Sequence, residues 1–148
     1  MKTLRTGHVG LNVTDLDRSI AFYTKALGLD VAGEGEHEGR RHAFLTHDGE
    51  LLLTLWQQAA DGFAASRAGL HHLAFQVDSI EEVKAAEQVL RELDAEFAYD
   101  GVVPHGEGAA SGGIFFTDPD GTRLEIYASS GADIAPAPTP SGPTCGFF

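Results

Sequence analysis

The sequence contains two similar stretches, and this internal repeat constrains the fold more than any other feature. Residues 8–27 are HVGLNVTDLDRSIAFYTKAL, and residues 72–90 are HLAFQVDSIEEVKAAEQVL. Each begins with a histidine and a short apolar run typical of a strand, and continues with a polar cap and an amphipathic helical pattern. The repeat therefore predicts two equivalent modules.

The spacing of apolar residues predicts one helix in each module. In the first, apolar positions lie on one helical face from about residue 15 to residue 27: Leu16, Ile20, Tyr23 and Leu27. Gly28 follows as a C-terminal stop. In the second, Ser79 and Glu82 have the spacing of a capping box, and the helical pattern continues to about residue 93.

Strand-like sequence follows each predicted helix. An Asp-Gly pair lies between two apolar runs at residues 48–49 and again at residues 120–121, which indicates a β-hairpin in each half. Each half is thus predicted to be βαβββ, and the fold class α+β. We place the first module at residues 1–66 and the second at residues 67–130.

The remaining residues, 131–148, differ in kind. They hold four of the six prolines of the chain and show no hydrophobic periodicity. This composition predicts a Pro/Gly-rich flexible C-terminal tail. We expect its apolar last residues, CGFF, to be disordered.

Charge and composition exclude several classes of partner. The formal net charge of −12 argues against binding to nucleic acid or to an anionic membrane surface. Apolar runs stay well below the roughly 18 residues of a membrane span, and the first residues lack a secretory signal pattern. The single cysteine, Cys145, cannot form an internal disulfide, so we expect a cytoplasmic protein.

Three residues at related places in the two modules suggest a metal site. His8 and His72 begin the matching strands, and Glu125 stands between Leu124 and Ile126 in a strand otherwise suited to burial. A buried glutamate is costly unless something pairs with it. Two imidazoles and one carboxylate form the facial triad that binds divalent ions and leaves positions open for substrate.

Other interpretations of these residues remain open. A histidine at the start of a strand is often a structural, hydrogen-bonded residue, and Glu125 could pair with Arg123 or Arg41. His71 points to the opposite face of its strand from His72, so we interpret it as structural. Aligning the two Asp-Gly hairpins places Leu53 opposite Glu125, or Thr54 if the register shifts by one residue.

Three segments resemble the vicinal oxygen chelate superfamily of glyoxalases, bleomycin-resistance proteins, fosfomycin-resistance enzymes and type I extradiol dioxygenases. They are GHVGLNVTDLDRSIAFYTKALGL, LHHLAFQVDS and FFTDPDGTRLEIYA. The resemblance implies two βαβββ modules that form an open, curled mixed sheet around a central site, and it implies a homodimer. It also implies a divalent metal ion, Fe(II), Mn, Ni or Zn, on His8, His72 and Glu125.

The chain departs from particular members of that superfamily. Glyoxalase I has a further polar ligand or base at the place of Leu53 or Thr54, and neither of these residues is a suitable proton acceptor. Extradiol dioxygenases usually carry a tyrosine where this chain has Phe115. The phosphonate-binding residues of the fosfomycin enzymes would fall near His105, Ala109, Gly113 and Phe115, where none is retained.

These observations lead to an expected function and one alternative. We expect a metal-dependent enzyme, dioxygenase-like or lyase/isomerase-like, that acts on a small oxygenated substrate, aromatic or not. Side chains expected to contact the substrate are Phe44, Trp56, His105, Phe115 and Tyr127, and the glycine-rich segment 100–113 is a candidate lid. The alternative is a metal-free protein that confers antibiotic resistance by sequestering an antibiotic or natural product.

Overall fold

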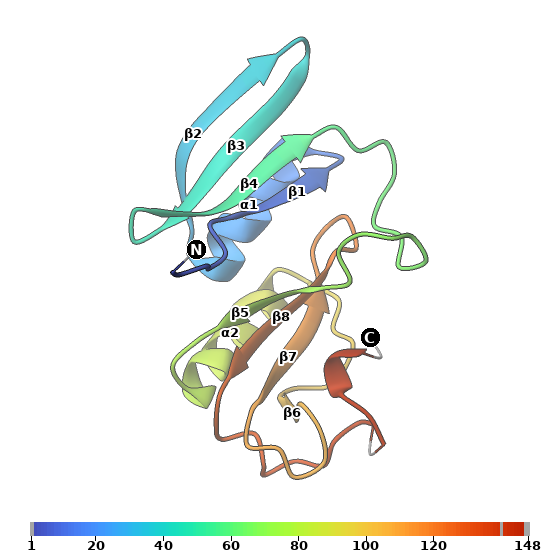
Figure 1. Ribbon diagram of the computed structural model, residues 1–148. Helices are drawn as coiled ribbons and strands as arrows, with labels where there is room; N and C mark the ends of the chain where they lie inside the picture. The colour runs from blue at the N-terminus through green and yellow to red at the C-terminus, as the bar shows by residue number, and fades with distance from the viewer. Residues whose placement is uncertain (1, 140, 147–148) are drawn as a thin grey trace. The chain divides into compact units, whose positions relative to one another are not determined.

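The computed structural model describes residues 2–139 and 141–146, and the chain divides into two compact units, residues 1–63 and 64–148. The sequence placed this division after residue 66. Each unit has the predicted βαβββ order, so the α+β class is confirmed (Figure 1). The first unit contains β1 (Val9–Val13), α1 (Leu16–Leu27), β2 (Asp30–His37), β3 (Arg40–His47) and β4 (Glu50–Gln57). The second contains β5 (Leu73–Gln76), α2 (Ile80–Glu92), β6 (Val103–Pro104), β7 (Gly112–Thr117), β8 (Arg123–Ala128) and a 3₁₀ turn, η1 (Thr144–Gly146).

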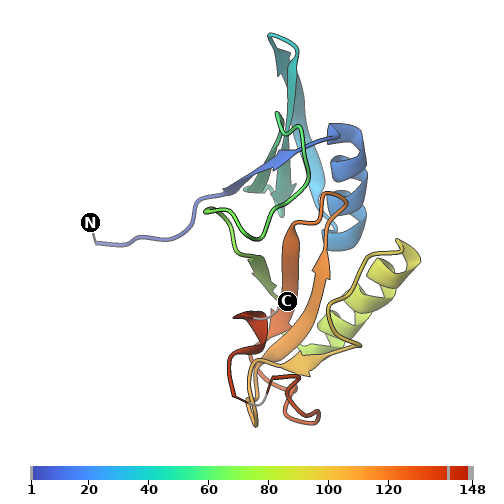
Figure 2. The same cartoon turned by 90° about the vertical axis from the view of Figure 1, so that its right-hand side faces the viewer.

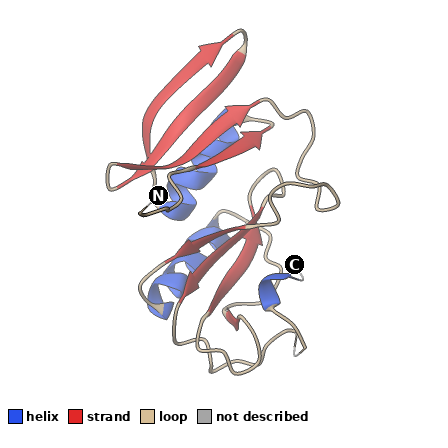
Figure 3. Ribbon diagram, in the orientation of Figure 1, coloured by secondary structure: helices blue, strands red, loops and turns tan. Residues whose placement is uncertain are grey.

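Each unit has one four-stranded mixed sheet with the same topology. The strand order is β1-β4-β3-β2 in the first unit and β5-β8-β7-β6 in the second (Figure 3). In both, the first strand pairs in parallel with the last, and the other neighbours are antiparallel. In each unit the strand that directly follows His8 or His72 therefore lies beside the last strand of that unit, β4 or β8.

The helices begin within a residue of their predicted starts. Asp15 caps α1 by accepting a hydrogen bond from the Arg18 backbone N–H at 3.0 Å, and Gly28 ends the helix at φ 64°. Ser79 and Glu82 form the capping box of α2. Each helix lies against its own sheet (Figure 2). Within residues 2–139 and 141–146, no helix has the length and apolar character needed to cross a membrane.

The cores consist of the apolar faces that meet between helix and sheet. In the first unit the largest fully buried side chains are Val13, Leu16, Tyr23, Leu45, Leu53 and Leu55. In the second they include Val83, Leu90, Ile114, Phe116 and Leu124. Because side chains of a strand alternate between its two faces, the residues between these core positions lie on the other face of each sheet.

The register of the last strands decides which residue corresponds to Glu125. Gly10 lies opposite Thr54 in the first unit, and Ala74 lies opposite Glu125 in the second. The structural counterpart of Glu125 is therefore Thr54. The alignment that put Leu53 there is wrong by one residue, and its alternative is correct.

A β-bulge explains the one-residue error. In the β3–β4 ladder Leu45 pairs with Leu53, whereas Thr46 pairs with Leu51, so Leu52 is an extra residue in β4. A bulge of this kind shifts every following residue by one position relative to the turn. The β7–β8 ladder runs without such a shift from Gly112 to Thr117.

The C-terminal segment packs on the second unit through hydrogen bonds. Thr144 is fully buried, and its hydroxyl donates to the carbonyl of Pro104 at 2.6 Å. Its backbone N–H donates to the carbonyl of His105 at 2.9 Å, and the Tyr99 hydroxyl donates to the Thr144 carbonyl at 3.2 Å. The sequence predicted a flexible tail here, yet residues 131–139 and 141–146 include these specific contacts. Positions 140 and 147–148, which include the end of the CGFF segment, lie outside the described residues.

Candidate functional site

Glu125 lies at the centre of the candidate site. It is in the middle of β8, between Leu124 and Ile126, which are buried in the core of the second unit. Glu125 itself is only 2 % exposed, on the opposite face of the strand. A carboxylate so deeply buried requires a partner, because loss of hydration disfavours its charge.

Two histidines face the Glu125 carboxylate, one at each oxygen. The Nε2 atom of His105 contacts Oε1, and the Nε2 atom of His72 lies 3.7 Å from Oε2. His72 directly precedes β5, the parallel neighbour of β8, and His105 directly follows β6. Three segments of one sheet thus bring their side chains together.

The environment of His72 favours its neutral form. Burial lowers the pKa of His72 below its usual value, and the nearby Glu125 carboxylate opposes this only in part. The Nδ1 atoms of His71 and His72 lie 2.8 Å apart, so one ring donates a hydrogen bond to the other. This contact occupies Nδ1 of His72 while its Nε2 faces Glu125. When His72 is the donor in this bond, its neutral ring keeps on Nε2 the lone pair that a metal ion binds. The prediction that His71 points away from His72 is wrong, because both residues precede β5 and the alternation of a strand does not apply to them.

Two glycines allow the chain to bring His105 to Glu125. A Cβ atom on Gly112 would lie 2.7 Å from the Cα of Pro104, and one on Gly113 would lie 2.7 Å from the Cα of Tyr127. Real Cβ atoms do not make such close contacts, so side chains at these positions would push neighbouring strands apart. The close packing of β6, β7 and β8 therefore depends on this Gly-Gly pair.

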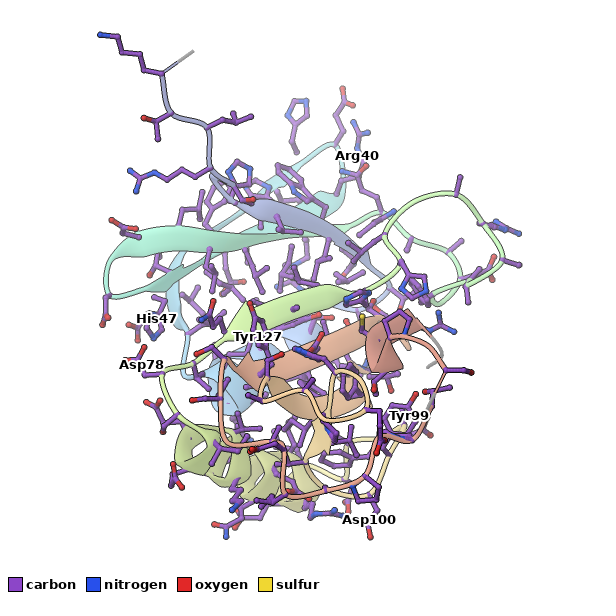
Figure 4. The ribbon with its side chains drawn as sticks, turned by 60° about the horizontal axis from the view of Figure 1, so that its bottom comes forward. Arg40, His47, Asp78, Tyr99, Asp100 and Tyr127 are labelled. Atoms are coloured by element: carbon purple, nitrogen blue, oxygen red, sulfur yellow. The ribbon has the colours of Figure 1, made fainter. Side chains whose placement is uncertain are left out.

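Aromatic rings surround the carboxylate. Phe115 lies opposite Glu125 in the β7–β8 ladder and is fully buried. The His105 ring centroid is 5.2 Å from that of Tyr127 and 6.3 Å from that of Phe115. Tyr127, labelled in Figure 4, lies on β8 beside β5. Its hydroxyl donates to Oε1 of Gln76 at 3.2 Å. Three of the five predicted substrate-contacting residues are thus neighbours of Glu125.

The other two predicted substrate-contacting residues belong to the first unit. Phe44 and Trp56 lie with ring centroids 6.3 Å apart, and the His42 ring stacks on Trp56 at 5.1 Å. The indole N–H of Trp56 donates to the hydroxyl of Thr54 at 3.0 Å. These side chains form an aromatic cluster on their own sheet.

His8 belongs to the first unit, where it is exposed directly before β1. Of the predicted metal ligands, the structure brings His72 and Glu125 together, and the participation of His8 stays a prediction. Among the described residues, no group of three or more His, Cys, Asp or Glu side chains has the arrangement of a metal site.

Sequence reasoning missed the contact of His105 with Glu125. The sequence predicts that His105 contacts the substrate, and the loop that carries it has no periodicity that would place it beside Glu125. The available signal was the glycine pair at residues 112–113, which permits close strand packing just after the loop.

The chemistry of His72 and Glu125 fits a divalent ion. A nitrogen and an oxygen that bind one ion at about 2.1 Å each can lie no more than about 4.2 Å apart. The 3.7 Å between His72 Nε2 and Glu125 Oε2 is within this limit and beyond ordinary hydrogen-bond range. A buried carboxylate and a neutral imidazole are ligands that suit Fe(II), Mn, Ni and Zn.

Comparisons with known proteins agree with the fold. Residues 5–126 match the model of the Glyoxalase/Bleomycin resistance protein/Dioxygenase superfamily. A catechol-2,3-dioxygenase of Bacillus subtilis (strain 168) is 29% identical over 125 residues, which are 82% of this chain and 40% of that protein. The chain therefore spans less than half the length of this relative.

Two solved structures are similar in fold. A glyoxylase/bleomycin resistance protein/dioxygenase domain from Frankia sp. EAN1pec superposes with a TM-score of 0.72 at 28% identity, covering 85% of this chain and 98% of that one. The fosfomycin resistance protein FosX from Listeria monocytogenes, complexed with Mn(II) and a sulfate ion, superposes with a TM-score of 0.60. Its identity is 22%, with 86% of this chain and 93% of that chain covered, which shows the shared fold alone.

Proposed function

Because the chain belongs to the Glyoxalase/Bleomycin resistance protein/Dioxygenase superfamily, we propose that it is an enzyme that depends on a divalent metal ion. His8, His72 and Glu125 are the proposed ligands. The observation that carries the proposal is the buried Glu125 carboxylate, one of whose oxygens lies 3.7 Å from Nε2 of His72. Burial lowers the pKa of His72 and so favours its neutral form. Such a carboxylate is expensive to keep in a core, and a bound cation offsets that cost.

The bound ion, Fe(II), Mn, Ni or Zn, would supply Lewis-acid chemistry, or oxygen activation in the case of Fe(II). The protein's own residues prepare the site. Glu125 supplies negative charge inside a region from which its burial excludes water. His72 presents a neutral ring nitrogen toward the same space, and His71 fixes the orientation of that ring. His105 and Tyr127 form a partly aromatic wall suited to a small oxygenated substrate.

Thr54 bears on the type of reaction. The glyoxalase-like place for an additional ligand or base holds this threonine, whose hydroxyl already accepts a hydrogen bond from Trp56. A threonine hydroxyl is a poor proton acceptor near neutral pH. We therefore favour dioxygenase-like chemistry, or a lyase or isomerase reaction that needs no base from β4.

The setting is part of the proposal. We propose a cytoplasmic homodimer that binds a small molecule, on the grounds of the single cysteine and the family fold. Whether the three ligands come from one chain or from two follows from the dimer's arrangement. Mixing His8→Ala and Glu125→Gln chains distinguishes these cases, because a site shared between chains would be restored in a fraction of the mixed dimers.

The decisive experiment is the metal content of protein purified without chelator or affinity tag, measured by mass spectrometry. We expect near-stoichiometric Fe, Mn, Ni or Zn in the wild type and its loss in Glu125→Gln, His72→Ala and His8→Ala. His47→Ala is the matched control, since His47 is an exposed histidine at the end of β3. A wild type that retains no metal even after reconstitution would contradict the proposal. Screening aromatic antibiotics for binding would then test the metal-free sequestering function.

A further inference from the structure

Both ring nitrogens of His105 are engaged. Its Nε2 contacts Oε1 of Glu125, and its Nδ1 lies 2.9 Å from the hydroxyl oxygen of Ser111. An ionised carboxylate only accepts hydrogen bonds, so the proton of a neutral His105 ring must be on Nε2. Nδ1 is then an acceptor, and the Ser111 hydroxyl is its donor. The three residues form a directional chain in which Ser111 donates to His105 and His105 donates to Glu125.

This arrangement leaves His105 without a nitrogen lone pair for a metal ion. One nitrogen carries the proton given to Glu125, and the lone pair of the other receives the proton of Ser111. His105 is therefore a hydrogen-bond donor to the Glu125 carboxylate and not a second metal ligand next to it. It holds Oε1, so that the other oxygen, Oε2, is the one directed toward His72.

The backbone of His105 is fixed as firmly as its ring. Its N–H donates to the carbonyl of Ser111 at 3.0 Å, and its own carbonyl accepts the Thr144 N–H at 2.9 Å. Thr144 is also bonded to the preceding residue, Pro104, at 2.6 Å. The C-terminal segment thus supports the site by holding the strand end that carries His105.

From these contacts we propose that His105 is a positioning residue, which orients Glu125 for the metal ion under the control of Ser111. The inference rests on the proposed function. It goes beyond that function because it gives a role to a residue outside the ligand set, and a structural reason for the packed C-terminal segment. Residues that hold a ligand in this way typically change metal affinity by about 10- to 100-fold when they are removed.

The test measures Mn(II) affinity of the full chain by calorimetry and by the electron paramagnetic resonance signal of free Mn(II). We expect His105→Leu to weaken Mn(II) binding by about 10- to 100-fold. His105→Gln should recover most of the affinity, because its amide N–H can donate to Oε1 from nearly the same place. Ser111→Ala should give an intermediate loss. His37→Leu, at an exposed histidine of β2, is the control and should bind as the wild type does.

A second measurement needs no metal. Nitrogen NMR of the imidazole rings reports which nitrogen carries the proton, and we expect the Nε2–H form for His105 in the wild type. The unfolding midpoint of each metal-free variant shows whether a change in affinity merely follows a loss of structure.

The outcomes separate the two proposals. Wild-type protein that binds no Mn(II) would overturn the proposed function, and the positioning role with it. Wild-type binding together with equal binding by His105→Leu would overturn the positioning role alone. Equal losses in His105→Leu and His105→Gln, with unchanged stability, would mean that His105 is itself a ligand, which also contradicts the inference. An Nδ1–H ring would contradict the proposed direction of the chain.

Discussion

The last strands of the two units put different side chains at one equivalent position. Thr54 in β4 and Glu125 in β8 are both buried, at 3 % and 2 % exposure. Each lies opposite a phenylalanine of the neighbouring antiparallel strand, Phe44 or Phe115. The two positions thus share their place in the sheet and their burial. They differ in the buried group, which is a neutral hydroxyl at Thr54 and a carboxylate at Glu125.

The partners of the two side chains show what this difference requires. The Thr54 hydroxyl is satisfied locally by the indole N–H of Trp56, two residues along the same strand. The Glu125 carboxylate draws instead on His72 and His105, from two other segments of the unit. A neutral hydroxyl needs one nearby partner, whereas a buried charge needs an assembled site. The two units therefore have similar backbones, and the second unit is the one that contains a buried charged residue, Glu125, with histidine partners.

Thr54→Glu should have the largest effect on stability. In the metal-free protein a carboxylate at this position would be buried beside Trp56 and Phe44, with only the exposed His8 at the place that His72 has in the second unit, and we expect destabilisation of about 3 kcal/mol or more. Urea unfolding measures the effect. Thr54→Gln is the matched control, since it has the same size without the charge. Equal stability of the two variants would mean that the first unit tolerates a buried charge.

Gly113→Ala should have the next largest effect. The added Cβ would lie 2.7 Å from the Cα of Tyr127, and relief of that contact requires β7 to move away from β8. We expect a loss of about 1–3 kcal/mol, typical of overpacking. The equivalent residue of the first unit is His42, which lies opposite Trp56 as Gly113 lies opposite Tyr127. Because His42 already carries a side chain there, His42→Ala should show no comparable strain, and a larger loss in that variant would contradict this account.

Thr54→Val should have the smallest effect. It keeps the shape of the side chain but removes the acceptor of the Trp56 N–H, at a cost of about 1 kcal/mol. Trp56 is the single tryptophan of the chain, so its fluorescence reports the change directly. Thr54→Ser keeps the hydroxyl and should retain the wild-type emission maximum. Identical spectra for Thr54→Val and the wild type would show that the bond is absent in solution.

Features that depend on local patterns could be predicted from the amino-acid sequence. The repeat predicted two βαβββ units, and the caps at Asp15 and Ser79 mark helices that begin within a residue of the predicted positions. Burial of Glu125 followed from its place between Leu124 and Ile126. These features were predictable because helical and strand periods, caps and turns are properties of a few neighbouring residues.

The strand register and the contacts between distant segments could not be predicted in this way and were found only in the folded chain. The extra residue Leu52 in β4 makes Thr54, rather than Leu53, the counterpart of Glu125. The approach of His105 to Glu125 and the bonds of Thr144 to the end of β6 join residues that are 20 to 40 positions apart. No local period encodes such contacts, because they arise when strands and loops pack and each buried polar group must find a partner.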